Sequence, residues 1–353
     1  MKNGVSGQSP EELSALLTEM GEKPFRGKQV FEFIHRNLAD SFEEMTTLSK
    51  ALRDRLEETL GPVRSLVEVA RATSQDGTIK LALATADGEV IETVLIPMES
   101  GTFTQCISSQ VGCAMGCRFC MTAKLGFRRN LTAAEIVDQH HLARIVAGEG
   151  RIRNLVYMGM GEPLLNFDSV KQSVTLLQHP RGCDLSRRRI TLSTCGVLPG
   201  IERMATEIDA HLAISLNAPN QELRADLMPV SKKYPLEQLM ETLKKFPLAP
   251  RQRLTFEYVL LKGVNDSPEH ARQLVRLLSH IPNKINIIPF NPFPSAPFEG
   301  PTEEGIAAFV NVLSKRNVTV TVRRSRGSDI EAACGQLAGK VGDSRKATDN
   351  PAQ

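Results

Sequence analysis

Along its first part, the chain spaces its hydrophobic residues as amphipathic helices do. Residues 1 to about 70 place apolar positions at helical spacing, which predicts helices over 25–34 and 48–60. Ser9-Pro10-Glu11-Glu12 is a typical helix start, because a capping serine precedes a first-turn proline and two acids. We therefore expect a small N-terminal helical domain over residues 1–75.

Two strand-like apolar runs then follow. They cover residues 80–84 and 90–96 and flank Asp87-Gly88, a strong signal for a hairpin turn. A β-hairpin over residues 76–101 is therefore expected to link the N-terminal domain to the rest of the chain.

From about residue 102, strand-like and helix-like segments alternate. Strands are expected over residues 104–108, 154–158, 189–193, 211–216, 254–260, 284–289 and 318–323, with helices such as 132–147, 235–246, 267–279 and 302–316 between them. Repeated strand–helix units predict a parallel sheet or an α/β barrel, whose ligands lie at the carboxyl ends of the strands. The residues expected there are Gly159-Met160-Gly161-Glu162, Ser193, Ser215-Leu216-Asn217 and Asn291.

Composition places the chain among globular proteins, since 41% of its residues are hydrophobic and 24% are charged. No apolar run reaches the ~18 residues that span a bilayer, and the first residues lack the apolar core of a secretory signal. Seven cysteines without the spacing of a disulfide framework fit a reducing compartment. We expect a cytoplasmic protein with no membrane partner, and a monomer as the default.

Basic residues gather in short clusters, although the net charge is only +3. The clusters are Arg128-Arg129, Arg187-Arg188-Arg189, Lys232-Lys233, Lys244-Lys245 and Arg323-Arg324 with Arg326, and the N-terminal domain adds Arg26, Lys28 and Arg36. Such clusters can bind the phosphates of a nucleic acid. Each can equally be an ordinary solvated surface.

The strongest chemical signal is the segment Cys113-Ala114-Met115-Gly116-Cys117-Arg118-Phe119-Cys120. An iron–sulfur cubane normally takes four cysteine ligands, so three leave one iron open for substrate chemistry. The spacing alone leaves two other interpretations open: a zinc site completed by a distant ligand, or three buried thiols that pack as small apolar side chains. His140 and His141 make a poor chelating pair, because adjacent residues point in different directions on a helix, and we expect them on its surface.

Three more segments accompany this motif and extend the signal. They are Cys106-Ile107-Ser108-Ser109-Gln110-Val111-Gly112-Cys113, Met158-Gly159-Met160-Gly161-Glu162-Pro163-Leu164-Leu165-Asn166 and Ala332-Ala333-Cys334-Gly335-Gln336-Leu337. With them, residues 25–340 resemble the dual-specificity RNA adenine-C2 methyltransferases of the radical S-adenosylmethionine (SAM) superfamily. The resemblance implies an α/β fold, a partial (β/α)6 radical SAM barrel over residues 102–339, with a disordered tail over 340–353.

The resemblance also implies the cofactors. A [4Fe-4S] cluster would be held by Cys113, Cys117 and Cys120, and two SAM molecules would be used per turnover. Cys334 would take a methyl group from one SAM, and a radical made from the second would remove a hydrogen atom from that S-methyl group. The resulting methylene radical would add to C2 of adenine.

Two more residues have roles by the same resemblance. Cys106 would resolve the covalent adduct between RNA and enzyme, which leaves a Cys106–Cys334 disulfide. Glu92 corresponds to the proton acceptor of the family, although the segment between Glu92 and Cys106 is one residue longer here. Cys183 and Cys195 match no catalytic position and are expected to be structural.

The remaining family positions form the SAM pocket. They are Gly161, Glu162, Ser193, Ser215, Leu216, Asn217 and Asn291. A glycine at 161 allows close backbone approach, and the carboxylate of Glu162 suits the SAM ammonium. The family more often has histidine at the position of Asn217. We therefore expect the backbone of Asn217, rather than its side chain, to contact SAM.

The implied substrates are 23S ribosomal RNA at the peptidyl-transferase centre and transfer RNA at the adenine next to the anticodon, with a flavodoxin or ferredoxin as reductant. A related resistance branch methylates adenine C8, but it carries alanine in the segment where this chain has Pro163-Leu164. A zinc-bound RNA-binding module would leave Cys106 and Cys334 unexplained. An iron–sulfur electron carrier would need four ligands and a short chain.

Overall fold

The computed structural model describes residues 4–148, 151–293, 296–316 and 318–339, so the tail expected over 340–353 lies outside the described residues. Within them, ten strands form one sheet in the order β1-β2-β3-β4-β7-β8-β9-β10-β11-β12. These strands are β1 (Leu66–Thr73), β2 (Ile79–Thr85), β3 (Val90–Pro97), β4 (Phe103–Cys106), β7 (Ile152–Tyr157), β8 (Ile190–Thr194), β9 (His211–Ser215), β10 (Leu254–Leu260), β11 (Asn283–Pro289) and β12 (Val320–Val322).

The parallel part of this sheet runs from β4 to β12, and helices connect its strands. The helices are α4 (Met121–Lys124), α5 (Ala133–Ala147), α6 (Phe167–Gln178), α7 (Leu198–Glu207), α8 (Gln221–Leu227), α9 (Val230–Lys233), α10 (Leu236–Lys245), α11 (Pro268–Leu278) and α12 (Glu303–Ser314). The expected α/β architecture with a parallel sheet is confirmed. Each predicted strand and helix of this region begins and ends within two residues of an observed one.

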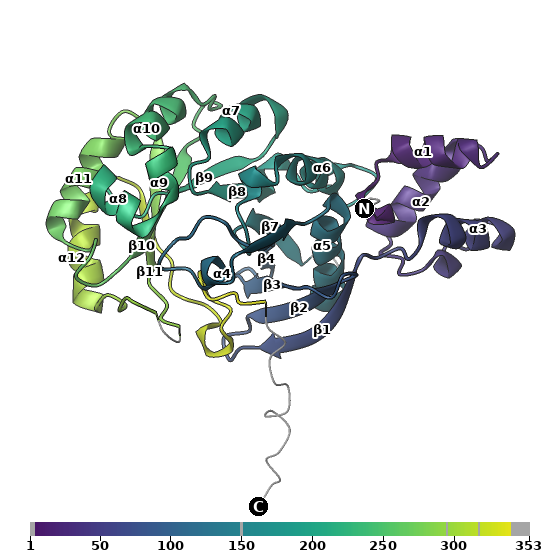
Figure 1. Cartoon of the computed structure of the whole chain (residues 1–353), viewed down its shortest axis with the longest axis horizontal. Helices are drawn as coiled ribbons and strands as arrows, with labels where there is room; N and C mark the ends of the chain where they lie inside the picture. The colour runs from purple at the N-terminus through teal and green to yellow at the C-terminus, as the bar shows by residue number, and fades with distance from the viewer. Residues whose placement is uncertain (1–3, 149–150, 294–295, 317, 340–353) are drawn as a thin grey trace, which may run out of the picture.

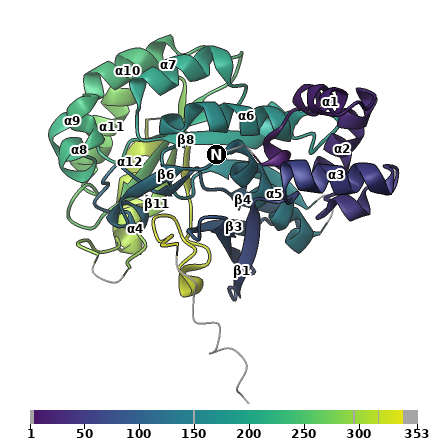
Figure 2. The ribbon, with the colours of Figure 1, turned by 45° about the vertical axis from the view of Figure 1, so that its right-hand side comes forward.

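Local sequence explains why these helices pack where they do. In α10, Leu236, Leu239, Met240 and Leu243 are buried and recur at three- and four-residue spacing. They give the helix one apolar face, which packs inward. Figures 1 and 2 show α7 to α12 on the outer side of the parallel strands, so the carboxyl ends of the strands stay accessible.

The N-terminal helices form a lobe beside α5 and α6 (Figure 1). They are α1 (Pro10–Glu19), α2 (Phe25–His35) and α3 (Lys50–Leu60). The expected helix start is confirmed: Ser9 Oγ accepts from the Glu12 N–H, and the Glu12 carboxylate accepts from the Ser9 N–H. The prediction of helix up to about residue 70 is wrong beyond α3. Leu66–Thr73 forms strand β1, whose residues alternate between more and less buried positions.

The expected hairpin is present and belongs to the large sheet. Strands β2 and β3 pair antiparallel around the Asp87-Gly88 turn, where Gly88 has a φ of 82°. Strand β3 also pairs with β4, which joins the hairpin directly to the parallel strands. The hairpin that precedes the barrel is therefore part of the same hydrogen-bonded sheet.

Helix α5 is buried on nearly all sides, which corrects one expectation. It packs against β1 and β3 of the sheet, against α6, and against the short helix η1 (Val5–Gly7). His140 and His141 are each 1% exposed, so their expected place on the helix surface is wrong. A helix enclosed by a sheet and by two other elements has no solvent face for either residue.

In the described part of the chain, no helix is both long and apolar enough to cross a membrane.

Candidate active site

One cavity opens at the carboxyl ends of the parallel strands. Of the predicted site residues, it is lined by Cys106, Cys113, Cys117, Cys120, Gly161, Glu162, Ser193, Ser215, Asn217, Asn291 and Cys334. They come from the ends of β4, β8 and β9, from the loops after β5, β7 and β11, and from the segment after β12. Leu216 and Glu92 do not line the cavity; both are buried behind it.

The three-cysteine loop begins after Gly112, the last residue of β5 (Gln110–Gly112), and ends at α4. Gly112 has a φ of 72°, and a Cβ there would lie 1.8 Å from the Gly126 carbonyl oxygen. That close approach lets β5 pair with β6 (Phe127–Asn130) while the Cys113 N–H donates to Gly126 at 2.9 Å. The loop is thereby closed at its base, and its thiols line the cavity.

The donor set fits an iron–sulfur cluster. Three thiols of one short loop line the cavity, and a cubane that keeps one iron open takes three cysteine ligands. Cys195 also lines the cavity, with its Sγ 3.9 Å from Cys117 Sγ.

Electrostatics at this loop keep the thiols protonated unless a cation is bound. Burial, and then the neighbouring Cys120, Cys117 and Glu162, raise the pKa of Cys113 to about 12. Burial also raises the pKa of Cys120. Metal ligation requires thiolates, and packed thiolates beside a buried carboxylate are stable only with positive charge at the centre of the group.

The Gly161-Glu162 turn is built into the wall of the cavity. Gly161 has a φ of 98°, and a Cβ there would lie 2.5 Å from the Gln110 side chain, so no other residue fits. The Glu162 carboxylate accepts from the Cys195 N–H at 2.7 Å and from the Leu164 N–H at 3.1 Å. Burial raises the pKa of Glu162, and these hydrogen bonds oppose the shift. The carboxylate thus also fixes two loops of the cavity.

Sequence reasoning missed Glu257, which lies in the cavity wall on β10. Its carboxylate accepts a 2.7 Å hydrogen bond from Ser193 Oγ, and Ser193 in turn lies 3.4 Å from Ser215 Oγ. Glu257 is 6% exposed. The available signal was a charged residue inside the largely apolar strand Leu254–Leu260, because a buried carboxylate in a central strand needs hydrogen-bond partners.

Arg224 of α8 was missed as well, and it explains the place of Leu216. Its guanidinium is fully buried and donates to the carbonyls of Cys195, Ser215 and Leu216 at 2.7, 3.4 and 3.2 Å. Burial lowers its pKa, while Cys195 and Cys117 act in the opposite direction. The arginine therefore fixes the backbone at the ends of β8 and β9, where the resemblance places SAM contacts.

Two further predicted cysteines line the cavity. Cys106 ends β4 and is buried, and burial raises its pKa to about 12. Cys334 keeps solvent exposure, and desolvation by the surrounding walls, then Glu257 and Cys106, raise its thiol pKa above the ordinary value. Both residues carry free thiols in this structure.

The segment that carries Cys334 is held by hydrogen bonds on both sides. Towards the cluster loop, the Met121 N–H donates to the Gly335 carbonyl at 2.7 Å, and Thr122 Oγ1 donates to the Leu337 carbonyl at 2.7 Å. Towards the hairpin, the Glu92 carboxylate accepts from the N–H groups of Ala338 and Gly339 at 2.7 and 3.0 Å. Cys334 is thus positioned relative to the cluster loop.

Glu92 lies on β3 and is 1% exposed. It therefore points into the protein, whereas a carboxylate on a strand ordinarily faces solvent. Its other oxygen lies 3.0 Å from Lys80 Nζ, and Lys80 also donates to the Glu331 carbonyl at 3.3 Å. The carboxylate is therefore engaged by one ammonium and two backbone N–H groups.

Several expected phosphate-binding residues are paired with acids. Arg129 binds the carboxylates of Asp87 and Glu135 at 2.6 and 2.8 Å, and Arg128 binds Glu89 at 2.7 Å. Those two arginines support the hairpin and α5. Lys28 and Arg36 in the N-terminal lobe are exposed, and Arg323 lines the cavity.

The strand order, the helical connections and the three-cysteine loop above the strand ends define a radical SAM enzyme. Residues 107–275 match the radical SAM superfamily, and residues 5–60 match the ribosomal RNA large subunit methyltransferase N-terminal domain. A crystal structure of a radical SAM methyltransferase from Sphaerobacter thermophilus superimposes with a TM-score of 0.92 at 42% identity, and covers 96% of this chain and 99% of that one.

Curated relatives are named dual-specificity RNA methyltransferase RlmN. The one from Nitratidesulfovibrio vulgaris is 49% identical over 93% of this chain and 92% of its own length. The one from Syntrophus aciditrophicus is 46% identical over 96% of this chain and 97% of its own. The chain belongs to this family of radical SAM RNA methyltransferases, and it uses a [4Fe-4S] cluster and SAM.

Proposed function

We propose that this enzyme methylates C2 of a specific adenine in 23S ribosomal RNA, at the peptidyl-transferase centre, and of the adenine next to the anticodon in transfer RNA. One observation supports this most: Cys334 and Cys106 line the same cavity as the three thiols of the cluster loop. Electron-poor adenine C2 does not attack a SAM methyl group as a nucleophile. A protein thiol that carries the methyl group into a radical site solves this problem.

In this proposal, each residue has a defined task. Cys113, Cys117 and Cys120 hold the cluster, while Gly161, Glu162, Ser193, Ser215, Leu216, Asn217 and Asn291 form the SAM pocket. When bound, the cluster and SAM supply a radical that removes one hydrogen atom from a methyl group. Cys334 carries that methyl group, and its carbon forms the new bond to adenine C2.

In this proposal, Cys106 releases the product. The adduct that the methylene radical forms carries an unpaired electron. Once it has lost the C2 proton, with Glu92 as the family's acceptor, and one electron, which the cluster would take back, the base is joined to Cys334 through a methylene group. Attack of the Cys106 thiolate on the Cys334 sulfur breaks the sulfur–carbon bond. The methylene carbon takes a proton and becomes the methyl group of the product, while the two sulfurs are oxidised to a disulfide.

The test is an analysis of the RNA product. The enzyme is purified without oxygen, reconstituted with iron and sulfide, and given SAM, a reductant and either a ribosomal RNA fragment from the peptidyl-transferase region or transfer RNA. Digested nucleosides are identified by mass and chromatographic standard, and we expect 2-methyladenosine. A peak of 8-methyladenosine would move the chain to the C8 branch, and release of 5′-deoxyadenosine without methylated adenosine would overturn the substrate assignment.

A Cys106→Ala variant tests the resolving step separately. It should still load a methyl group on Cys334 and react with RNA, and then stall with RNA covalently bound to protein. Denaturing electrophoresis with labelled RNA detects that adduct. Normal turnover by Cys106→Ala would show that the proposed resolving role is wrong, whereas Cys334→Ala should keep the cluster and form no adduct.

The remaining parts of the proposal concern partners. We assign the N-terminal helical domain, residues 1–75, to RNA binding, because a base within folded RNA must be exposed before it can enter a cavity. The hairpin over residues 76–101 connects this domain to the barrel over 102–339. A cytoplasmic flavodoxin or ferredoxin would supply the electrons.

A further inference from the structure

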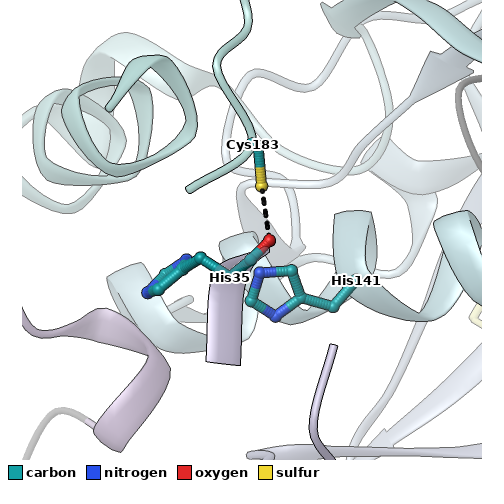
Figure 3. A group of neighbouring side chains, drawn as sticks. All are labelled: His35, His141 and Cys183. Carbon is teal, nitrogen blue, oxygen red and sulfur yellow. Dashed lines mark hydrogen bonds between the residues drawn. The ribbon is translucent and has the colours of Figure 1, made fainter. Parts of the chain in front are cut away.

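A second group of metal-binding side chains lies away from the cavity, where the N-terminal lobe meets the barrel. His35 ends α2, His141 lies on α5, and Cys183 lies in the connection between α6 and the short helix η4 (Arg187–Arg189). One ligand atom of each lies within 4.8 Å of the other two. Figure 3 shows the three residues side by side, with the Cys183 sulfur directed at the main-chain carbonyl oxygen of His35.

The two histidines are buried without hydrogen-bond partners for most of their ring nitrogens. His35 is 0% exposed, and neither Nδ1 nor Nε2 has a partner within the described residues. His141 is 1% exposed, and its Nε2 has none there either. A buried polar atom without a partner destabilises the folded protein, so these nitrogens favour a ligand that pairs with one nitrogen of each ring.

Protonation states agree with metal binding. Burial lowers the pKa of His35, and the neighbouring His141, His179 and Arg144 lower it further. Burial likewise lowers the pKa of His141, with Arg64 and Arg144 as further causes. Both rings are therefore neutral at physiological pH, and a neutral imidazole has the free lone pair that a metal ion needs.

The surroundings of the third ligand favour its protonated form, because Cys183 Sγ donates to the His35 carbonyl oxygen at 3.5 Å, and metal binding would displace that proton. Cys183 is only partly buried, which provides a path from solvent. The Arg144 guanidinium lies 3.6 Å from its sulfur and is held there by a 2.7 Å hydrogen bond to the His35 carbonyl. Arg144 lowers the pKa of this thiol, although burial dominates and raises it to about 11. A divalent cation would supply the remaining stabilisation of the thiolate.

His141 also has the supporting carboxylate that metal-bound histidines commonly show. Its Nδ1 lies 3.5 Å from Asp138 Oδ1, an oxygen without a hydrogen-bond partner in the described residues. The other oxygen of Asp138 accepts from the Ser65 N–H at 2.5 Å, which holds the carboxylate in place. At this distance the carboxylate does not hydrogen-bond to the ring, but its charge favours a proton on Nδ1, which would leave Nε2 free for a metal.

We propose that His35, His141 and Cys183 bind one Zn2+ ion, separate from the iron–sulfur cluster. Two imidazoles and one thiolate form a donor set that suits zinc, and a solvent molecule would complete a tetrahedral site. Because the ligands come from α2, α5 and the connection after α6, the ion would fasten the N-terminal lobe to the barrel. The inference does not depend on the substrate of the enzyme.

The test measures zinc in the full-length protein with its iron–sulfur cluster in place. Elemental analysis should find about one zinc per chain beside a full complement of iron. Cys183→Ser and His141→Gln should each lower zinc to near zero and leave iron unchanged. His179→Gln is the matched control, because this histidine lies beside Phe31 in the same region but outside the three-ligand group; its zinc content should remain that of the unmodified chain.

Zinc in the cluster cysteines is excluded by a second measurement. In a Cys113→Ala, Cys117→Ala, Cys120→Ala background, Co2+ should produce a thiolate-to-cobalt charge-transfer band, and adding Cys183→Ser should remove it. Asp138→Asn should weaken zinc binding by about 10–100-fold. Zinc should also raise the melting temperature of the parent and of His179→Gln, but not of Cys183→Ser.

Two results would overturn the proposal. One is a parent protein that takes up no zinc or cobalt outside its cluster cysteines when either ion is in excess. The other is a Cys183→Ser variant that folds, as judged by circular dichroism and iron content, and retains zinc. Cys183→Ser changes one atom in a partly buried side chain, so the test does not depend on whether the histidine variants fold.

Discussion

At the scale of single residues, the state of the Cys334 thiol governs the first proposed step. The thiolate is the nucleophile, and the walls of the cavity, Glu257 and Cys106 all raise the pKa of Cys334 above its ordinary value. At neutral pH the thiol form therefore dominates, and only a small fraction can attack the methyl group of SAM. The residue reacts slowly until a proton is removed.

This situation predicts a steep pH dependence. The rate of Cys334 self-methylation should rise about tenfold per pH unit between pH 7 and pH 9, since the thiolate fraction grows in that proportion below the pKa. The measurement is single-turnover transfer of labelled methyl from SAM, with Cys334→Ala as the blank. A flat profile would mean that a base within the cavity already holds the proton, with Glu257 as the obvious candidate.

Glu92 gives a second prediction at this scale, because its hydrogen bonds favour a positioning role beside the proton-acceptor role. Glu92→Gln should weaken the hold on Ala338 and Gly339, reduce self-methylation of Cys334 several-fold, and cost about 1–3 kcal/mol of stability. A residue that only accepts the C2 proton would leave self-methylation unchanged and lower RNA product alone. Glu89→Gln, on the preceding turn, is the matched control.

At the scale of elements, the turn between β1 and β2 supports the segment that carries Cys334. The Asp76 carboxylate accepts from the N–H groups of Thr78 and Gly327, each at 2.9 Å. Ser74 Oγ donates to Asp329 at 2.6 Å in the same contact. The turn after β1, a strand that the helical spacing of the sequence did not predict, thus holds one end of the segment that carries Cys334.

Removing this contact should affect activity without affecting the cluster. Asp76→Ala should cost about 1–2 kcal/mol of stability, since two hydrogen bonds are lost, and should lower both self-methylation and RNA product. Iron content and the absorbance of the cluster should stay normal. Asp54→Ala, at an exposed position on α3, should change none of these. Unchanged self-methylation in Asp76→Ala would show that the segment holds its place without the turn.

At the scale of the whole molecule, RNA binding is expected to extend from the cavity to the N-terminal lobe. Lys28 and Arg36 are exposed there, whereas Arg128 and Arg129 are paired with acids of the hairpin and α5. Each lysine or arginine that contacts a phosphate releases counterions, so binding weakens as salt rises. The free cationic surface of the lobe, rather than the paired arginines, should account for that dependence.

Lys28→Ala and Arg36→Ala should therefore each reduce the slope of log affinity against log salt by about one. The measurement is RNA binding at several salt concentrations with the reconstituted enzyme. Arg276→Ala is the control, because this residue lies on α11 and already pairs with Glu269 at 2.9 Å. Equal slopes for all three variants and the parent would exclude the lobe from phosphate contact.

Local patterns in the sequence determined most of the barrel. Strands such as Leu254–Leu260 and helices such as α10 follow from short-range periodicity, and the cysteine spacing with the Gly161-Glu162 turn indicated a cluster and SAM through their resemblance to a known family. These features are readable because each depends on residues close together in the chain. Because strands and helices alternate, the carboxyl ends of the parallel strands meet at one edge of the sheet.

Only the tertiary structure decided what surrounds those residues. It encloses α5 on nearly all sides, and therefore buries His140 and His141, which a helix considered alone would expose. It turns Glu92 inward against the Cys334 segment, places Glu257 and Arg224 beside the cavity, and brings Cys183 to two histidines. These outcomes depend on contacts between segments far apart in the chain, and local spacing does not encode such contacts.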